Sequence, residues 1–192
     1  MTKLVAFNGS PRKNGNTSLV VEEIFEVLGQ YGIETELIQV GNKAVHGCTA
    51  CGKCREKLDR QCHIKNDLLN TCIQKMIDAD GILLASPVYF GDITTETKAL
   101  IDVAGYVTRG NGNLLARKVA AGVVVQRRAG DLHALNSMNN FFLINQMIVP
   151  GSSYWNIAMG KNPGDVKNDT EGMQTMRQLA ENMAWLMKKL AR

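Results

Sequence analysis

Short apolar runs alternate along this chain with longer stretches in which apolar residues recur every three or four positions. The short runs are bounded by turn residues and predict β-strands, most of them covered on both faces. Residues 33–40 alternate with period two, which is typical of a strand nearer the edge of a sheet. The predicted strands are residues 4–7, 33–40, 81–85, 119–125 and one strand within residues 148–159.

The longer stretches predict amphipathic helices, one after each strand. The predicted helices are residues 17–30, a helix from residue 67, one from 94 or 95 to about 106, one at 132–145 and one from 169 or 170. Strand and helix alternate five times, with no repeat and no linker. This order predicts an α/β fold, a three-layer, doubly wound, five-stranded parallel sheet that forms a single domain over residues 1–192.

Three of the predicted strands end in polar or glycine-containing loops, at residues 8–17, 86–92 and 126–131. In a doubly wound sheet, ligands bind beyond the carboxyl ends of the strands. Because these three loops follow the carboxyl ends of parallel strands, we expect them to meet at one edge of the sheet and to form the ligand site.

The first of these loops has the composition of a phosphate site. It leads into a helix N-terminus, whose unpaired N–H groups and dipole attract anions. A nucleoside triphosphate is disfavoured, because Gly9 and Gly15 are one residue too far apart for a Walker motif and Asn16 stands where the lysine belongs. The loop also lacks the G-x-G-x-x-G dinucleotide motif. A single phosphate ester fits better.

Composition narrows the function classes only a little. The chain has 192 residues and a net charge of +4, a mild balance that suits small anionic molecules such as nucleotides. Its basic residues are scattered and not interleaved with aromatic residues, which argues against nucleic-acid binding. No apolar run reaches the ~20 residues that span a bilayer, and no signal peptide is evident, so we expect a cytoplasmic location with reduced cysteines and no membrane partner.

Four of the five cysteines lie in one segment of about residues 46–63 that has neither helical nor strand periodicity. Cys48, Cys51 and Cys54 are each three residues apart, and Cys62 follows after seven residues. Such a run is typical of iron–sulfur ligation, whereas a zinc site more often uses two separated C-x-x-C pairs. The fifth, Cys72, lies on an apolar helix face and is expected to be buried and inert.

Three segments of the sequence, residues 10–17, 86–91 and 165–172, resemble the flavodoxin-fold NAD(P)H-dependent FMN reductases. The resemblance covers nearly the whole chain and implies a flavodoxin-like sheet of order 2-1-3-4-5 with FMN as cofactor. It implies that the FMN phosphate is held by Ser10, Arg12, Asn16, Thr17 and Ser18. It implies that the isoalloxazine ring is lined by Pro87, Val88, Tyr89, Phe90 and Gly91.

Arg127, Arg128 and Gly130 are candidates for contacting the ring or the phosphates of an electron donor. The alternatives are that the two arginines are a solvated pair, and that Tyr89 and Phe90 fold inward as core aromatics. Two tryptophans, Trp155 and Trp185, are expected to be packing residues rather than ligands. The methionines of the last helix are expected to lie in the core or on an oligomer face.

The cysteine spacing resembles that of the iron–sulfur flavoproteins, a branch of the same family. This resemblance implies a [4Fe-4S] cluster held by Cys48, Cys51, Cys54 and Cys62. Free cysteines or a zinc ion at the same positions remain alternatives.

The functional hypothesis is an FMN-dependent redox protein that takes electrons from NAD(P)H or a ferredoxin and passes them, through the cluster, to an unknown small-molecule or protein acceptor. No proton-transfer residue is named, because the cofactor supplies the chemistry. One alternative is a plain NAD(P)H-dependent FMN or quinone reductase without a cluster. Another is a redox sensor that binds a phosphate-bearing ligand and carries free or zinc-bound cysteines. By the same resemblance we expect a homodimer or homotetramer.

Overall fold

The computed structural model describes residues 2–64 and 67–191. Its centre is a parallel sheet with the strand order β2-β1-β3-β4-β5. The strands are β1 (Lys3–Asn8), β2 (Glu34–Gln39), β3 (Gly81–Pro87), β4 (Val119–Gln126) and β5 (Ile157–Met159). The predicted fold class and strand order are confirmed. The strand expected at residues 33–40 is β2, an edge strand. Of the range 148–159, in which one strand was expected, only the last three residues form a strand, β5.

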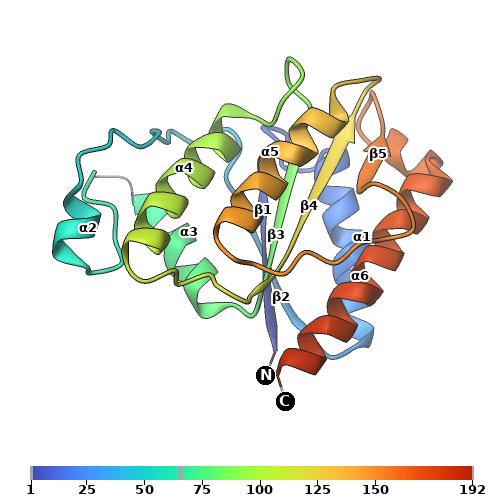
Figure 1. Ribbon diagram of the computed structural model, residues 1–192. Coiled ribbons are helices and arrows are strands. Elements are labelled where there is room, and N and C mark those ends of the chain that lie inside the picture. The colour runs from blue at the N-terminus through green and yellow to red at the C-terminus, as the bar shows by residue number, and fades with distance from the viewer. Residues whose placement is uncertain (1, 65–66, 192) are drawn as a thin grey trace.

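Helices cover both faces of the sheet, which gives three layers (Figure 1). One face carries α1 (Asn16–Gln30) and α6 (Thr170–Leu190), and their apolar side chains form one buried cluster with the sheet. The other face carries α3 (Asp67–Asp78), α4 (Thr95–Gly110) and α5 (Asp131–Ile144). Two short helices lie in connecting segments, α2 (Lys53–Lys57) and the 3-10 helix η1 (Asp165–Asn168).

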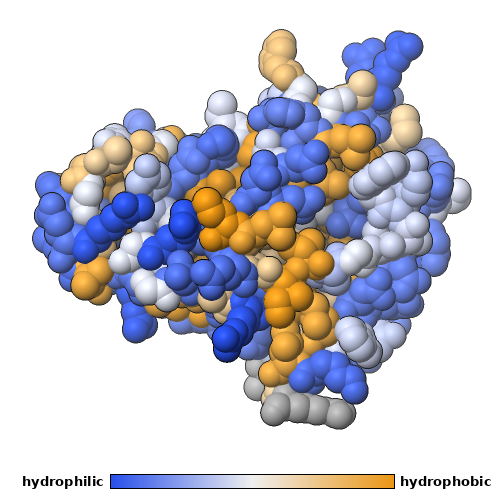
Figure 2. All heavy atoms as spheres, viewed as in Figure 1, coloured by the Kyte–Doolittle hydropathy of each residue, from blue (hydrophilic) through white to orange (hydrophobic). Residues whose placement is uncertain are grey.

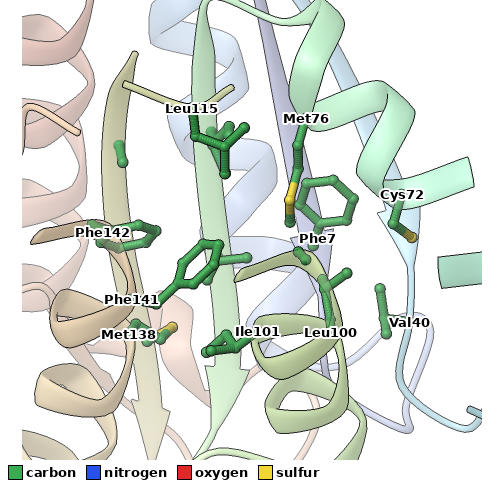
Figure 3. Packing of buried hydrophobic residues seen from close by; sticks show 14 of the residues in the cluster. Phe7, Val40, Cys72, Met76, Leu100, Ile101, Leu115, Met138, Phe141 and Phe142 are labelled. Carbon is green, nitrogen blue, oxygen red and sulfur yellow. The ribbon is translucent and has the colours of Figure 1, made fainter. Parts of the chain in front are cut away.

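The second face holds the larger aromatic core. Figure 3 shows Phe7 from β1, Leu100 from α4 and Phe142 from α5 among the side chains that fill this layer, and all three are almost fully buried. Cys72 belongs to the same cluster, as predicted, and burial raises the pKa of its thiol to about 12. A buried neutral thiol of this kind behaves as a small apolar side chain.

Two of the helices begin with a side-chain cap. The side chain of Thr94 accepts a hydrogen bond from the backbone N–H of Thr97 at the start of α4, and Asp169 accepts one from Gly172 at the start of α6. The helix expected to stop near residue 106 continues to Gly110.

The prediction that Trp155 and Trp185 are packing residues is wrong, because their side chains are 52% and 62% exposed. Trp155 precedes β5 in an irregular segment, and Trp185 lies on the outer face of α6. The methionines of α6 behave as expected: Met173, Met176 and Met183 are buried against the sheet. In the described part of the chain, no helix combines the length and the apolar character that crossing a bilayer requires.

Candidate flavin site and cysteine cavity

A cavity of about 380 Å³ lies at the carboxyl edge of the sheet, where the predicted loops meet. It joins the loop after β1 to the loops after β3 and β4, and adds a wall that follows β5. Its lining residues are Ser10, Arg12, Gly15, Asn16, Thr17, Pro87, Val88, Tyr89, Val125, Arg127, Gly160, Lys161 and Asn162. The structure therefore brings together residues from all three of the loops that the sequence analysis singled out.

The end of the cavity at α1 is suited to an anion. Within the described residues, α1 begins at Asn16 and has Gly15 at its N-cap position, so it lacks a side-chain cap, whereas Thr94 and Asp169 cap α4 and α6. The first turn of α1 contains no acidic residue, so its N–H groups and the helix dipole remain available to a negative charge. Arg12 lies in the same lining and adds a full positive charge.

Internal hydrogen bonds shape this loop. The hydroxyl of Ser18 donates to the carbonyl of Lys13 and accepts from the side-chain amide of Asn8, 3.2 Å away. The backbone N–H of Arg12 donates to the hydroxyl of Ser10 at 3.2 Å. These bonds preorganise the loop, so that a phosphate need not order it on binding. Direct phosphate contacts by Ser10, Arg12 and Ser18 stay predictions.

Asn16 links the loop after β1 to the segment after β5. Its side-chain amide donates to the carbonyl of Asn162 at 2.9 Å, and its oxygen accepts from the N–H of Gly164 at 2.8 Å. Since both groups of its side chain are already paired, Asn16 positions Asn162 at the cavity wall. This pairing leaves the main-chain N–H of Asn16, in the first turn of α1, as its candidate contact to a phosphate.

The loop after β3 makes a tight turn at the sheet edge. Backbone hydrogen bonds of 2.8 and 3.1 Å pair Tyr89 with Asp92, and the two residues between them, Phe90 and Gly91, have φ values of 49° and 84°. This turn points the Phe90 side chain away from the sheet, so that it is fully exposed, and leaves Tyr89 46% exposed. The alternative that these residues are core aromatics is therefore wrong.

The loop after β4 supports that turn. A Cβ atom on Gly130 would lie 2.9 Å from the Cα of Gly91 and 3.0 Å from a methyl group of Val88, so only glycine allows this close approach. The Asp92 carboxylate accepts a hydrogen bond from the Ser137 hydroxyl at 2.7 Å, which ties the turn to α5.

The two arginines of this loop differ in their position. Arg127 and Arg128 are both exposed, but Arg127 lines the cavity and Arg128 does not. Gly130 is also absent from the lining and acts through Gly91.

The cavity has a fourth wall, formed by Gly160, Lys161 and Asn162, none of which is among the predicted site residues. The Gly, Pro, Asn and Asp content of residues 160–168 indicates a surface loop and gives no sign of a ligand. The available signal was position, because this segment follows the last strand and must emerge at the same edge of the sheet. With Arg12 and Arg127, Lys161 makes three cations, and the described residues that line the cavity include no acid.

The residues present fit FMN. The cations and the uncapped helix suit its phosphate, and Pro87, Val88 and Tyr89 provide an apolar wall for a flat ring. Gln126 follows Val125 in β4 and is not among the lining residues; its side-chain oxygen is buried and has no hydrogen-bond partner among the residues that the structure describes. An unpaired acceptor of this kind is a reason to look for a missing donor, such as a ligand or a water.

The four clustered cysteines also gather, around a second and much smaller cavity of about 20 Å³. Cys48, Cys51, Cys54 and Cys62 line it, and Val103 and Val107 of α4 contribute to an apolar wall, together with the ring of Tyr106. Burial, reinforced by the neighbouring Cys48, raises the pKa of the Cys54 thiol. Four thiols are the donor set of iron–sulfur clusters and of structural zinc sites.

The thiols are near one another but are not arranged as ligands. Over residues 2–64 and 67–191, no three His, Cys, Asp or Glu side chains converge closely enough to hold a metal ion. A metal or cluster at this site therefore requires the cysteine segment to adjust around it.

The flavin cavity and the cysteine cavity lie at different parts of α4. At its N-terminus, the Thr94 hydroxyl donates to the carbonyl of Gly9 beneath the phosphate loop, at 2.9 Å. The cysteine cavity contacts α4 from Val103 onward. With a rise of ~1.5 Å per residue, these points are about 14 Å apart along the helix. In Figure 1, α2 and its segment lie at the left, away from the turns after β3 and β4 at the top.

Comparison with known proteins agrees with this geometry. The model of the NADPH-dependent FMN reductase family matches residues 2–162. An iron–sulfur flavoprotein of Methanocaldococcus jannaschii is 38% identical over 97% of this chain and 97% of its own length. The iron–sulfur flavoprotein of Methanosarcina thermophila is 33% identical over 94% of this chain and 93% of its own.

Solved structures with the same fold include RosB with a bound riboflavin-5'-phosphate derivative, with a TM-score of 0.76 and 18% identity over 100% of this chain and 81% of RosB. A flavodoxin-like WrbA-like protein from Agrobacterium tumefaciens has a TM-score of 0.67 and 14% identity over 98% of each chain. At such identities the likeness concerns the flavodoxin-like fold. The family match and the relatives show that this chain belongs to the NADPH-dependent FMN reductase family, in its iron–sulfur flavoprotein branch, and is an FMN-dependent oxidoreductase.

Proposed function

We propose that the protein binds FMN in the cavity at the carboxyl edge of the sheet. The observation that carries this assignment is that one cavity joins an uncapped helix N-terminus and three cations to an apolar wall. When bound there, FMN would supply the redox chemistry, and the protein would supply binding, orientation and charge.

Different residues would contact the phosphate and the ring of the cofactor. The first-turn N–H groups of α1, with Arg12 and the hydroxyls of Ser10 and Thr17, would hold the phosphate. The turn after β3 would cover the ring and exclude water from one face, and its shape would be kept by Gly130 and Asp92.

The electron donor we propose is NAD(P)H, with a reduced ferredoxin as the other candidate. The exposed cations Arg127 and Lys161 at the cavity favour an anionic donor such as a pyridine nucleotide. The acceptor would approach from the exposed side of the turn that carries Phe90.

For the cysteine cavity we propose a [4Fe-4S] cluster held by Cys48, Cys51, Cys54 and Cys62. Support comes from the gathering of the four thiols and from relatives whose names are iron–sulfur flavoprotein. Such a cluster would supply one-electron transfer to the acceptor. A reductase without a cluster, or a zinc-bound redox sensor, would be the conclusion if the thiols bind no iron.

A homodimer or homotetramer is the assembly we propose. Large apolar side chains are exposed at the end of α5 and beyond, including Leu143, Ile144 and Ile148. Figure 2 shows apolar residues gathered as a band on the same face of the molecule as α5.

The FMN assignment is tested by titrating the FMN-free protein and following the loss of flavin fluorescence. We expect one FMN per chain, and a loss of binding of about tenfold or more in Arg12→Ala, since a hydrogen bond to a charged group contributes about 1.5–3 kcal/mol. Lys13→Ala is the matched control, because Lys13 is an equally exposed neighbour that does not line the cavity. Equal affinities in the two variants would contradict the assignment.

The cluster is tested on protein purified and reconstituted without oxygen. We expect iron and sulfide close to four per chain and a visible absorption that dithionite bleaches. A variant in which the four clustered cysteines are changed to serine should lose both and keep its FMN. Zinc without iron would favour the sensor, and NAD(P)H oxidation without any metal would favour the plain reductase.

A further inference from the structure

The segment that carries the four clustered cysteines has few means of holding its own shape. Residues 41–64 contain one short helix, α2, and otherwise turns and irregular backbone. Most of its side chains are exposed, among them that of Cys51. A segment of this kind pays a high entropic cost when its thiols are brought together, unless contacts from outside hold it.

One such contact comes from Asn70, in the first part of α3. The oxygen of its side-chain amide accepts a hydrogen bond from the backbone N–H of Cys62 at 2.8 Å, and its nitrogen donates to the carbonyl of Cys62 at 2.9 Å. A single side chain thus pairs with both backbone polar groups of one predicted ligand residue. This two-point bond fixes the orientation of the Cys62 backbone as well as its position.

A second contact comes from Asn111, the residue that follows the last turn of α4. Its side-chain nitrogen donates to the carbonyl of Cys54 at 3.0 Å, and its oxygen accepts from the backbone N–H of Arg60 at 3.0 Å. The same nitrogen donates to Val107 within α4 at 2.8 Å, which orients the amide on the helix. Asn111 therefore links Cys54, within α2, to Arg60, which follows α2.

Packing reinforces the attachment to α4. The guanidinium of Arg55 lies 4.9 Å from the centre of the Tyr106 ring, and Tyr106 in turn lines the cysteine cavity. The side chain of Arg55 also lies over Gly110, where an added Cβ would come within 2.6 Å of it. The segment is thus held against helices whose own positions the core determines.

We propose that Asn70 and Asn111 are positioning residues that hold the backbones of Cys62 and Cys54, so that the four thiols face one cavity before any metal binds. The consequence for cluster loading rests on the proposed function, whereas the ordering of the metal-free segment does not. Residues outside the ligand set that orient it typically change metal affinity by about 10–100-fold. Both side-chain amides are occupied by these backbone hydrogen bonds, so we place neither asparagine in the ligand set.

The first test is made on the metal-free protein by amide hydrogen exchange, read at the N–H groups of Cys62 and Arg60. Asn70→Ala should speed exchange at Cys62 at least about tenfold, and Asn111→Ala should do the same at Arg60. Asn182→Ala is the matched control, because Asn182 makes a comparable side-chain bond of 2.7 Å to the carbonyl of Gly151, away from the cysteines. Wild-type exchange at both amides in both variants would overturn the proposal.

The second test measures iron and sulfide after reconstitution and the rate of iron loss to a chelator. Asn70→Ala and Asn111→Ala should lose iron about tenfold faster than wild type, while Asn182→Ala should not. Asn70→Asp keeps the acceptor for the Cys62 N–H and loses the donor, so it should fall between wild type and Asn70→Ala. A role limited to general stability predicts equal losses of FMN and iron; unchanged FMN binding with faster iron loss supports the positioning role.

The two proposals fail in different ways. If the wild-type protein takes up no iron, the cluster assignment is wrong, and the exchange rates alone decide the role of the asparagines. If the wild-type protein holds a cluster and the asparagine variants hold it equally well, the cluster assignment stands and the positioning role is wrong.

Discussion

Replacement of Gly130 by alanine tests whether the two loops of the flavin cavity depend on their close packing. Gly130 has a φ of +92°, and its added Cβ would lie 2.9 Å from the Cα of Gly91. Gly112 is a matched control, because its φ is +93° and an added Cβ there would meet nothing within 4 Å. The two variants share the same backbone strain and differ in the steric contact.

The expected losses of stability follow from the backbone strain and the steric contact. A left-handed backbone costs an L-residue about 1–2 kcal/mol, and this is the whole loss expected for Gly112→Ala. In Gly130→Ala the contact must open by about 0.5 Å, from 2.9 Å to the ordinary 3.4 Å, against the backbone of the turn after β3. Overpacking of this kind costs a further 1–3 kcal/mol, roughly.

Urea unfolding of the FMN-free proteins measures the change in stability. Fluorescence titration with FMN measures the change in FMN affinity. We expect Gly130→Ala to be less stable than Gly112→Ala and to bind FMN about tenfold more weakly, equivalent to about 1.4 kcal/mol or one displaced hydrogen bond. Gly112→Ala should bind FMN as wild type does. Equal stability and equal FMN affinity in the two variants would refute the reasoning.

Three further outcomes are expected. Phe90→Ala should leave the unfolding free energy of the FMN-free protein within about 0.5 kcal/mol of wild type, because the side chain is fully exposed. The same variant should weaken FMN binding, and an unchanged FMN affinity would count against a contact with the ring. Iodoacetamide should modify the exposed Cys51 first and leave Cys72 unmodified in the folded chain, since burial raises the Cys72 pKa to about 12, and peptide mass mapping would detect the reverse order. Glu36→Gln should lower stability at pH 7 by less than about 1 kcal/mol, because hydrogen bonds from two lysines hold the Glu36 pKa below its ordinary 4.5. A carboxyl with a lowered pKa stabilises the fold above its unfolded pKa and loses that effect as pH falls, so the urea midpoints of wild type and Glu36→Gln should converge below pH 4.5; a difference that persists in acid would contradict this.

Local patterns predicted much of this molecule because they reflect local physics. The continuous apolar runs of β3 and β4 are buried along nearly their whole length, and the period-two run of β2 lies at an edge. The caps Thr94 and Asp169 act within the next turn of their own helices. The approximate place of the site followed too, since parallel strands deliver their following loops to one edge.

Local patterns in the sequence did not predict the contacts between segments that are far apart in the chain. Asn16 reads as a phosphate ligand in its own loop, yet its side chain is paired with residues near position 164, almost 150 positions away. Phe90 is an aromatic residue of the kind that usually lies in a core, but the turn after β3 leaves its side chain exposed to solvent. Asn70 and Asn111 carry no local signal, because their importance depends on which segment lies beside α3 and α4.

Apart from FMN, which the resemblance to a known family implied, the sequence by itself determined the order of strands and helices, the buried face of each helix, and the residues that point to a phosphate ester and to a thiol-bound metal. Those features depend on periodicity, capping and residue chemistry, all of which act over a few neighbouring positions. The tertiary structure alone decided that Lys161 and Asn162 complete the flavin cavity, that Phe90 is exposed, and that two asparagines bond to the cysteine segment. These outcomes depend on how segments far apart in the chain pack together, and no local pattern encodes that geometry.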